Sequence, residues 1–253
     1  VCENGSTAAQ QLPNDLSKLL DVSGFPAAVD PFSQTPISQV EPPDVALQSS
    51  PVVQRVRQSV LKIHARAQSC SRALEGSGFV SSPQRVITNA HVVAGTDQVS
   101  VETDRGTLAA RVVLYDPDVD LAVLAVPNLT APALNFAPRD ARSGQDGIVL
   151  GYPLDGPYTA SAARVRERIS LRGPDIYDAK TVTRDVFTVR ATVKSGNSGG
   201  PLVDTGGNVI GVVFGAAVDD QETGFTLTAA EVADEVAAAP ELSRRVDTGQ
   251  CAG

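Results

Sequence analysis

The chain has 253 residues, of which 42% are hydrophobic and 20% are charged, a balance typical of a folded globular protein. Its 29 acidic and 21 basic residues give a net charge of −8, and no basic stripe could neutralise phosphates, which argues against nucleic acid as a partner. No segment approaches the roughly 20 apolar residues that span a bilayer, and no signal-peptide core opens the chain. Because the sequence starts at Val1 and contains no methionine, we expect a longer precursor with its targeting signal upstream.

The first 50 residues are rich in Pro, Ser, Gln and Asp and predict an N-terminal tether ahead of a folded part at 51–253. One short helix is expected at 14–23, where Asn14 can cap the start, three leucines share a face and Gly24 ends the run. We therefore expect a tether that carries a docking helix.

The folded part reads as all-β. Turn residues separate nearly all of the short β-type runs, and none is followed by the amphipathic helix of a βαβ unit. A Pro/Ala-rich linker at 127–141 divides the strands into two groups of about six, which predicts two six-stranded antiparallel barrels, at about 52–128 and 142–228. The expected strands are at residues 59–66, 85–89, 98–103, 108–115, 121–126, 147–152, 162–171, 186–192, 201–203, 209–214 and 224–227.

A helix is expected after the last strand. Thr228 and Glu231 form a capping box for the run 229–239, and Pro240 stops it. The prediction is a C-terminal helix and tail at 229–253.

The sharpest chemical signal is Gly-Asn-Ser-Gly-Gly-Pro at 196–201. A nucleophilic serine needs its Oγ projected from a tight turn, with backbone N–H groups converging on a developing oxyanion, and flanking glycines permit both. The alternative is a plain glycine-rich loop. We identify Ser198 as the candidate nucleophile.

A serine of this kind needs a base, and the chain has two histidines. Strand alternation places His64 on the outer face with Lys62 and Arg66, as expected for a solvated strand residue. His91 leaves a strand and enters a small turn, where packing can fix its side chain beside a cleft. We therefore assign His91 as the general base, against the alternative of a buried structural histidine.

An acid must orient the histidine, and Tyr-Asp-Pro-Asp-Val-Asp at 115–120 precedes an apolar strand. Asp116 and Asp118 flank a proline and suit a turn, whereas Asp120 abuts the buried strand, where an unpaired carboxylate is costly. Asp120 is thus the candidate acid. The order His, Asp, Ser excludes an α/β-hydrolase, in which the histidine follows the serine, because no histidine lies beyond position 91.

The three cysteines, Cys2, Cys70 and Cys251, lack the short spacings of zinc sites, so no metal and no cofactor are expected. Two of them would pair in an exported protein, and all three would stay reduced in the cytosol.

Four motifs in order resemble the HtrA/Deg branch of the trypsin-like proteases, which have the chymotrypsin fold: Gly-Ser-Gly-Phe-Val at 76–80, Thr-Asn-Ala-His-Val-Val at 88–93, Asp-Pro-Asp-Val-Asp-Leu-Ala at 116–122, and 196–201. With Val-Val-Phe-Gly-Ala-Ala at 212–217, the chain is more closely similar to the MarP-type acid-resistance periplasmic serine proteases of mycobacteria and their relatives. This resemblance implies a membrane domain upstream, a periplasmic location and a role in acid or oxidative stress.

The resemblance also implies a disulfide between Cys70 and Cys251, with Cys2 unassigned. It places a specificity pocket near Thr192, walled by Phe214, Gly215 and Ala216, and the absence of an acid at Thr192 predicts an uncharged apolar P1 residue.

Two departures from the family pattern limit what the resemblance transfers. Asn197 stands where digestive members carry an aspartate, so activation by an ion pair with a new amino terminus is not expected. Only about 25 residues follow position 227, too few for the PDZ domain of HtrA proteins.

We therefore expect a serine endopeptidase with the triad His91, Asp120 and Ser198, and an oxyanion hole formed by the N–H groups of Gly196 and Ser198. Its partners would be protein or peptide substrates, it would reach the membrane only through an upstream segment, and the protease domain would be monomeric. The alternatives are a non-catalytic protease-like binding or scaffold domain, and an esterase on the same fold.

Overall fold

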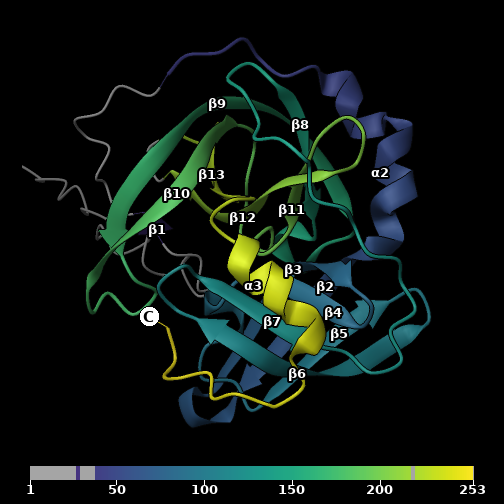
Figure 1. Ribbon diagram of the computed structural model, residues 1–253, viewed down its shortest axis with the longest axis vertical. Coiled ribbons are helices and arrows are strands. Elements are labelled where there is room, and N and C mark those ends of the chain that lie inside the picture. Colours follow the sequence, from purple (N-terminus) through teal and green to yellow (C-terminus); the bar gives the residue numbers. More distant parts are fainter. Residues whose placement is uncertain (1–26, 29–37, 218–219, 253) are drawn as a thin grey trace, which may run out of the picture.

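The computed structural model describes residues 27–28, 38–217 and 220–252. Within these ranges the chain forms two packed β-barrels, with a short helix lying across them (Figure 1). The helix expected at 14–23 lies outside the described residues. No helix in the described ranges is long and apolar enough to cross a membrane.

The first barrel is a closed ring of six antiparallel strands among the described residues. In ring order these are β2 (Val60–Ala67), β3 (Arg72–Ser82), β4 (Arg85–Thr88), β7 (Leu121–Ala125), β6 (Gly106–Asp116) and β5 (Gln98–Thr103).

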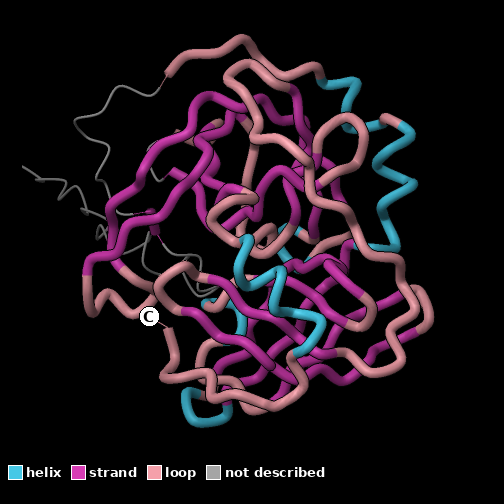
Figure 2. The backbone as a smooth tube through the Cα atoms, viewed as in Figure 1, coloured by secondary structure: helices cyan, strands magenta, loops and turns pink. Residues whose placement is uncertain are grey.

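The second barrel follows the long linker, which is mostly loop in Figure 2. Its strands lie in the order β12-β11-β8-β9-β10-β13, and β13 pairs back with β12, so the six described strands also form a ring. The two-residue β1 (Ala27–Ala28) adds to β12 in parallel. The bounds are β8 (Asp146–Gly151), β9 (Thr159–Pro174), β10 (Thr181–Arg190), β11 (Pro201–Val203), β12 (Val209–Ala217) and β13 (Thr223–Thr228). The predicted all-β, chymotrypsin-like architecture is confirmed.

Helical segments are short in the described ranges. The α-helices are α2 (Pro51–Val56) and α3 (Ala233–Ala238); the 3-10 turns are η1 (Val45–Ser49), η2 (Arg57–Ser59), η3 (Gln68–Cys70), η4 (His91–Val93), η5 (Pro153–Asp155) and η6 (Ala239–Glu241). Neither α2 nor the strand β3 was predicted from the sequence.

The two barrels share an apolar interface. Each barrel has its own buried cluster, and a third cluster joins Phe79 and Leu121 of the first barrel to Ile148 and Phe225 of the second. Burial of this surface holds the barrels in a defined relative position, which matters because the expected site residues come from both.

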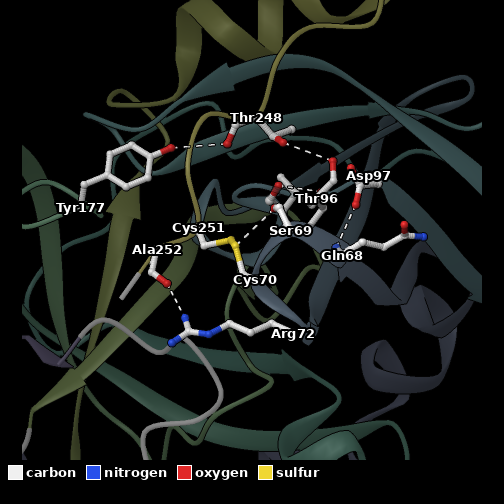
Figure 3. Close-up of a disulfide and its surroundings, with 11 residues drawn as sticks. Gln68, Ser69, Cys70, Arg72, Thr96, Asp97, Tyr177, Thr248, Cys251 and Ala252 are labelled. Carbon is white, nitrogen blue, oxygen red and sulfur yellow. Dashed lines mark hydrogen bonds between the residues drawn. A yellow bond between two sulfur atoms is a disulfide. The ribbon is translucent and has the colours of Figure 1, made fainter.

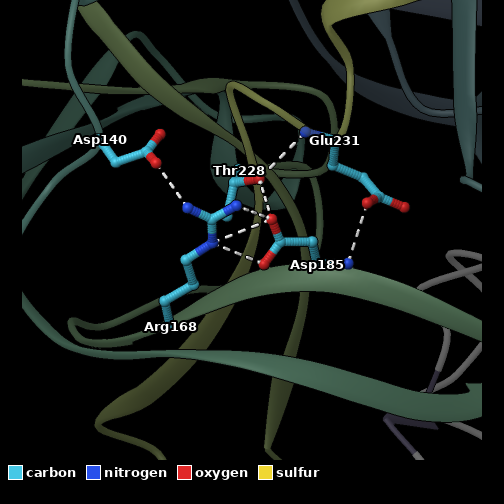
Figure 4. Close-up of polar contacts among 5 residues, drawn as sticks. All are labelled: Asp140, Arg168, Asp185, Thr228 and Glu231. Atoms are coloured by element: carbon cyan, nitrogen blue, oxygen red, sulfur yellow. Dashed lines mark hydrogen bonds and ion pairs between the residues drawn. The ribbon is translucent and has the colours of Figure 1, made fainter.

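The C-terminal helix begins later than predicted. Thr228 Oγ1 accepts a hydrogen bond from the Glu231 N–H (3.0 Å), but the Glu231 carboxylate binds the Asp185 N–H (3.0 Å) and does not complete the capping box (Figure 4). Thr228 is the last residue of β13, turns follow it, and α3 begins at Ala233 instead of residue 229. Helical structure continues past Ala238 as η6, which contains Pro240.

The tail returns to the first barrel through the Cys70–Cys251 disulfide, whose Cα atoms lie 6.6 Å apart (Figure 3). The Thr248 carbonyl accepts from the Gly95 N–H at 2.9 Å and from the Tyr177 hydroxyl at 3.4 Å. The pairing implied by the resemblance is thus present, and Cys2 lies outside the described residues.

Loss of this disulfide is expected to destabilise the fold, because it closes a loop between residues 181 positions apart. Cys251→Ser should lower the free energy of unfolding by about 2–5 kcal/mol and the melting temperature by roughly 5–15 °C. Thermal unfolding with and without reductant measures this. The variant itself should not respond to reductant, and a wild-type melting temperature unchanged by reduction would contradict the prediction.

Candidate active site

His91 lies where β4 ends, at the start of η4, and only 2% of it is exposed. Its Nδ1 is 2.7 Å from Asp120 Oδ2, and its backbone N–H donates to Asp120 Oδ1 at 2.9 Å. A carboxylate at Nδ1 favours the tautomer with the proton on that nitrogen, which leaves the lone pair on Nε2. The imidazole is therefore held in the orientation that a general base requires.

Asp120 ends a tight turn just before β7 and is 1% exposed. The Asp116 carboxylate accepts from the N–H groups of Asp118 (2.9 Å) and Val119 (3.0 Å), and Asn89 Nδ2 donates to the Asp120 carbonyl (2.8 Å). Asp120 has a φ of 67°, a left-handed conformation that is uncommon outside glycine. The expected buried, partnered carboxylate is present, held by contacts on both sides of its turn.

Ser198 lies in a turn that glycine makes possible. Gly196 and Gly199 have φ values of 88° and 80°, and a Cβ on Gly199 would lie 2.2 Å from the Ser77 carbonyl oxygen. The Gly199 N–H donates to the Val213 carbonyl (2.8 Å), which ties the turn to β12 of the second barrel. The turn thus presents Ser198 at the boundary between the barrels.

Two atoms in this region are buried without partners. Ser198 Oγ and His91 Nε2 make no hydrogen bond to another described residue. The Ser198 carbonyl oxygen and the Val92 side chain would lie 3.2 and 2.8 Å from a Cβ on Gly76, so the serine turn packs beside the histidine turn. Buried polar groups without partners cost free energy and call for an explanation, which a reactive site provides.

Ser77 of β3 connects the two barrels beneath the serine turn. Its N–H donates to the Ser198 carbonyl (2.8 Å), and its Oγ donates to the Gly196 carbonyl (2.6 Å) while accepting from the Tyr152 N–H (2.9 Å). These bonds hold the Gly196 peptide in one orientation. This role of Ser77 was not predicted from the sequence, where Gly-Ser-Gly at 76–78 served only as a family signature. The available signal was a polar residue between two glycines in an otherwise apolar run.

Ser77→Ala should remove this support and leave the half-buried Tyr152 N–H without its hydrogen-bond acceptor. We expect a loss of about 1–3 kcal/mol in unfolding free energy, together with a lower kcat. Thermal unfolding and steady-state kinetics measure both effects. Ser81→Ala is the matched control, because Ser81 Oγ has no partner among the described residues, and equal effects of the two changes would contradict the prediction.

The amides expected to form an oxyanion hole are available. The N–H groups of Gly196 and Ser198 donate to no other described residue, whereas the Asn197 N–H between them donates to the Lys194 carbonyl (3.0 Å). The backbone N–H groups on either side of Asn197 are therefore available to donate to a substrate oxygen.

The expected specificity residues lie in two places. Thr192 follows β10 and is exposed, whereas Phe214 and Gly215 are buried in β12 and Ala216 is half-buried. The Phe214 ring packs against Phe225, with 6.4 Å between ring centroids.

His64 lies away from this site, on β2, half-buried and with Nε2 3.3 Å from a Glu102 oxygen. Among the described residues, one group of three side chains could hold a metal ion. It consists of His64, Glu75 and Asp155, whose potential ligand atoms lie within 4.8 Å of one another. The Lys62 ammonium lies 2.5 Å from Asp155 Oδ1, so a cation already neutralises that carboxylate.

Known proteins resemble this chain along its whole length. The trypsin-like peptidase domain family matches residues 76–212. The chain is 53% identical over 252 residues to the serine protease Rv3671c of Mycobacterium tuberculosis H37Rv, covering 99% of this chain and 63% of that relative. A probable periplasmic DegP-like serine endoprotease of Brucella suis is 38% identical over 148 residues, 54% of this chain and 27% of the relative. The chain thus spans less than two thirds of these relatives.

The fold agrees with these relatives. The crystal structure of the active form of the Rv3671c protease matches with a TM-score of 0.85 and 54% identity, over 89% of this chain and 99% of that one. The predicted resemblance to mycobacterial and HtrA/Deg-type proteases is confirmed. Because the matched family domain covers more than half of the sequence, the chain belongs to the trypsin-like peptidase family.

Proposed function

We propose that this protein is an endopeptidase that cleaves protein substrates through an acyl-enzyme, with Ser198, His91 and Asp120 as its catalytic triad. The observation that carries the proposal is the buried His91–Asp120 hydrogen bond (2.7 Å) beside a glycine turn that presents Ser198. The unpartnered Ser198 Oγ and His91 Nε2 support it, because the serine hydroxyl needs a hydrogen-bond acceptor and the histidine nitrogen needs a donor.

In the first step, Ser198 Oγ attacks the carbonyl carbon of the scissile peptide bond and its proton passes to His91 Nε2. Asp120 stabilises the imidazolium and remains ionised. The N–H groups of Gly196 and Ser198 donate to the oxyanion, and each such donor lowers the barrier by about 3 kcal/mol.

The intermediate then collapses as His91 returns the proton to the leaving amine and the C–N bond breaks. Water, deprotonated by His91, attacks the acyl ester and releases the carboxylic acid product and free Ser198.

We also propose that substrates with an uncharged apolar P1 residue are preferred, because no acid occupies Thr192 and the neighbouring Phe214, Gly215 and Ala216 are uncharged. A peptide library cut mainly after Arg or Lys would contradict this preference.

The location we propose is the cell envelope, with the protease held at the membrane by a segment outside this chain and the protease domain monomeric. The periplasmic DegP-like relatives and the Cys70–Cys251 disulfide, which persists in oxidising compartments, support an extracytoplasmic site. A role in acid or oxidative stress rests on the resemblance to acid-resistance proteases.

Fluorophosphonate labelling tests the proposed chemistry, because the probe reacts covalently only with an activated serine. We expect labelling of the oxidised protein, loss of labelling in Ser198→Ala and His91→Ala, and normal labelling of the control His64→Ala. An unlabelled parent would favour a non-catalytic binding domain. Labelling with cleavage of esters but not of unfolded protein substrates would favour an esterase.

A further inference from the structure

Arg184 of β10 extends from the second barrel to the turn that carries Asp120. It is 6% exposed, and its Nε donates to the Asp118 carbonyl at 2.7 Å while Nη1 donates to the Pro174 carbonyl at 3.0 Å. The guanidinium also lies over the Phe214 ring, 5.9 Å from its centroid. One buried cation therefore contacts the acid-bearing turn of one barrel and strand β12 of the other.

Among the carboxylates near Arg184, Asp120 interacts with its charge most strongly. Burial lowers the pKa of the Arg184 guanidinium, and Asp120 opposes that effect more than the other nearby carboxylates do. An arginine remains protonated even when it is buried. Arg184 and Asp120 thus interact through space, without a direct hydrogen bond between them among those described.

The remaining charges around this turn are mostly acidic. Lys180 forms an ion pair with Asp118 (2.7 Å), but its side chain is 57% exposed, so water screens its charge. Arg184 is the buried cation of the group. The other ionisable groups near the turn are Asp116 and Asp118 within it, Asp175 and Tyr177 of the β9–β10 hairpin, Tyr115 of β6, Glu231 after β13, and Glu235 of α3.

The turn needs this support because its geometry is unfavourable by itself. Asp120 has a left-handed φ of 67°, a conformation that persists only where the surroundings hold it. Asn89 binds the Asp120 carbonyl from within the first barrel, whereas Arg184 binds the Asp118 carbonyl from the second. The second bond makes the position of Asp120 depend on how the barrels are aligned, and Ser198 lies on the second barrel.

We propose that Arg184 is a positioning residue for the triad, which fixes the 116–120 turn against the second barrel and offsets the negative charge of Asp120. The inference rests on the proposed function of His91, Asp120 and Ser198. A variant that lacks this positive charge would leave the buried Asp120 carboxylate uncompensated beside His91.

The test compares Arg184→Met and Arg184→Lys with the control Lys180→Met, which removes an exposed cation that pairs with Asp118 of the same turn. In Arg184→Met, kcat should fall about 10- to 100-fold, because small misplacements of catalytic groups cost this much, with KM nearly unchanged. The acid limb of its kcat/KM profile should move to higher pH by on the order of 0.5 unit. Arg184→Lys keeps the charge, so its acid limb should stay while kcat falls. Lys180→Met should match the wild type.

A merely structural role would lower kcat or stability without moving the acid limb. Arg184→Met with unchanged kcat and acid limb, or with the same profile as Lys180→Met, would overturn the proposal. If Arg184→Met does not fold, the kcat of Arg184→Lys tests the proposal instead. A wild-type kcat in Arg184→Lys would refute the positioning role. Failure of the proposed function is distinct, since the wild-type protein would then show no fluorophosphonate labelling.

Discussion

Replacing Ser198 with alanine is expected to lower kcat for peptide cleavage by about 10⁶-fold, as loss of a serine nucleophile does in a protease of this mechanism. The reason is that Ser198 Oγ is the attacking atom, and no other described hydroxyl lies in the same turn except that of Ser195. The fold should be retained, because Ser198 Oγ makes no hydrogen bond to another described residue. Steady-state kinetics and thermal unfolding on the same preparations measure both effects.

Ser195→Ala is the matched control, because it removes a hydroxyl from the same turn. Ser195 contributes its carbonyl oxygen to a hydrogen bond with the Leu154 N–H (2.8 Å), and that bond survives the substitution. Its activity should stay near that of the wild type. Residual activity in Ser198→Ala above about 1% of wild type, in a preparation free of other proteases, would refute Ser198 as the nucleophile.

Asp120→Asn is expected to lower kcat by about 10⁴-fold, the size of effect seen when this aspartate of a serine protease triad is neutralised. An asparagine can donate its amide hydrogens to His91 Nδ1, which favours the tautomer with the proton on Nε2. That tautomer cannot accept the Ser198 proton. The imidazolium would also lose the negative charge that stabilises it. The pH–rate profile and kcat measure the change.

Asp118→Asn provides the control for charge, because it neutralises a neighbouring carboxylate that is 45% exposed and paired with Lys180. A change of no more than a few-fold is expected there, since exposed ion pairs contribute little. If Asp120→Asn retained more than a tenth of wild-type kcat, Asp120 would not be the residue that orients His91.

Much of the strand order could be predicted locally. Runs at 98–103 and 201–203 agree with β5 and β11 residue for residue, because alternation and turn residues are properties of short segments. The strand β3 was missed because Gly76 and Gly78 lower the β propensity of the run. In the fold, a Cβ on Gly78 would lie 2.7 Å from the Ile87 carbonyl oxygen, so the close approach of β4 explains the glycine.

The helix start was missed for a related reason. Thr228 and Glu231 have the spacing of a capping box, and one of its two hydrogen bonds forms. The other is replaced by a bond from the Asp185 N–H, and Arg168 in turn pairs with Asp185 (Figure 4). A partner 46 residues away competed with the local motif.

The sequence alone determined the strand pattern, the candidate serine in its glycine turn and the candidate acid beside a buried strand, because these features depend on neighbouring residues and on chain order. Only the tertiary structure decided which groups support them. The Oγ of Ser77 binds a carbonyl 119 residues away, and Arg184 binds one 66 residues away in the other barrel. Such contacts form only when the two barrels pack through their shared apolar interface. The hydrophobic periodicity of a single segment does not predict how two barrels pack together.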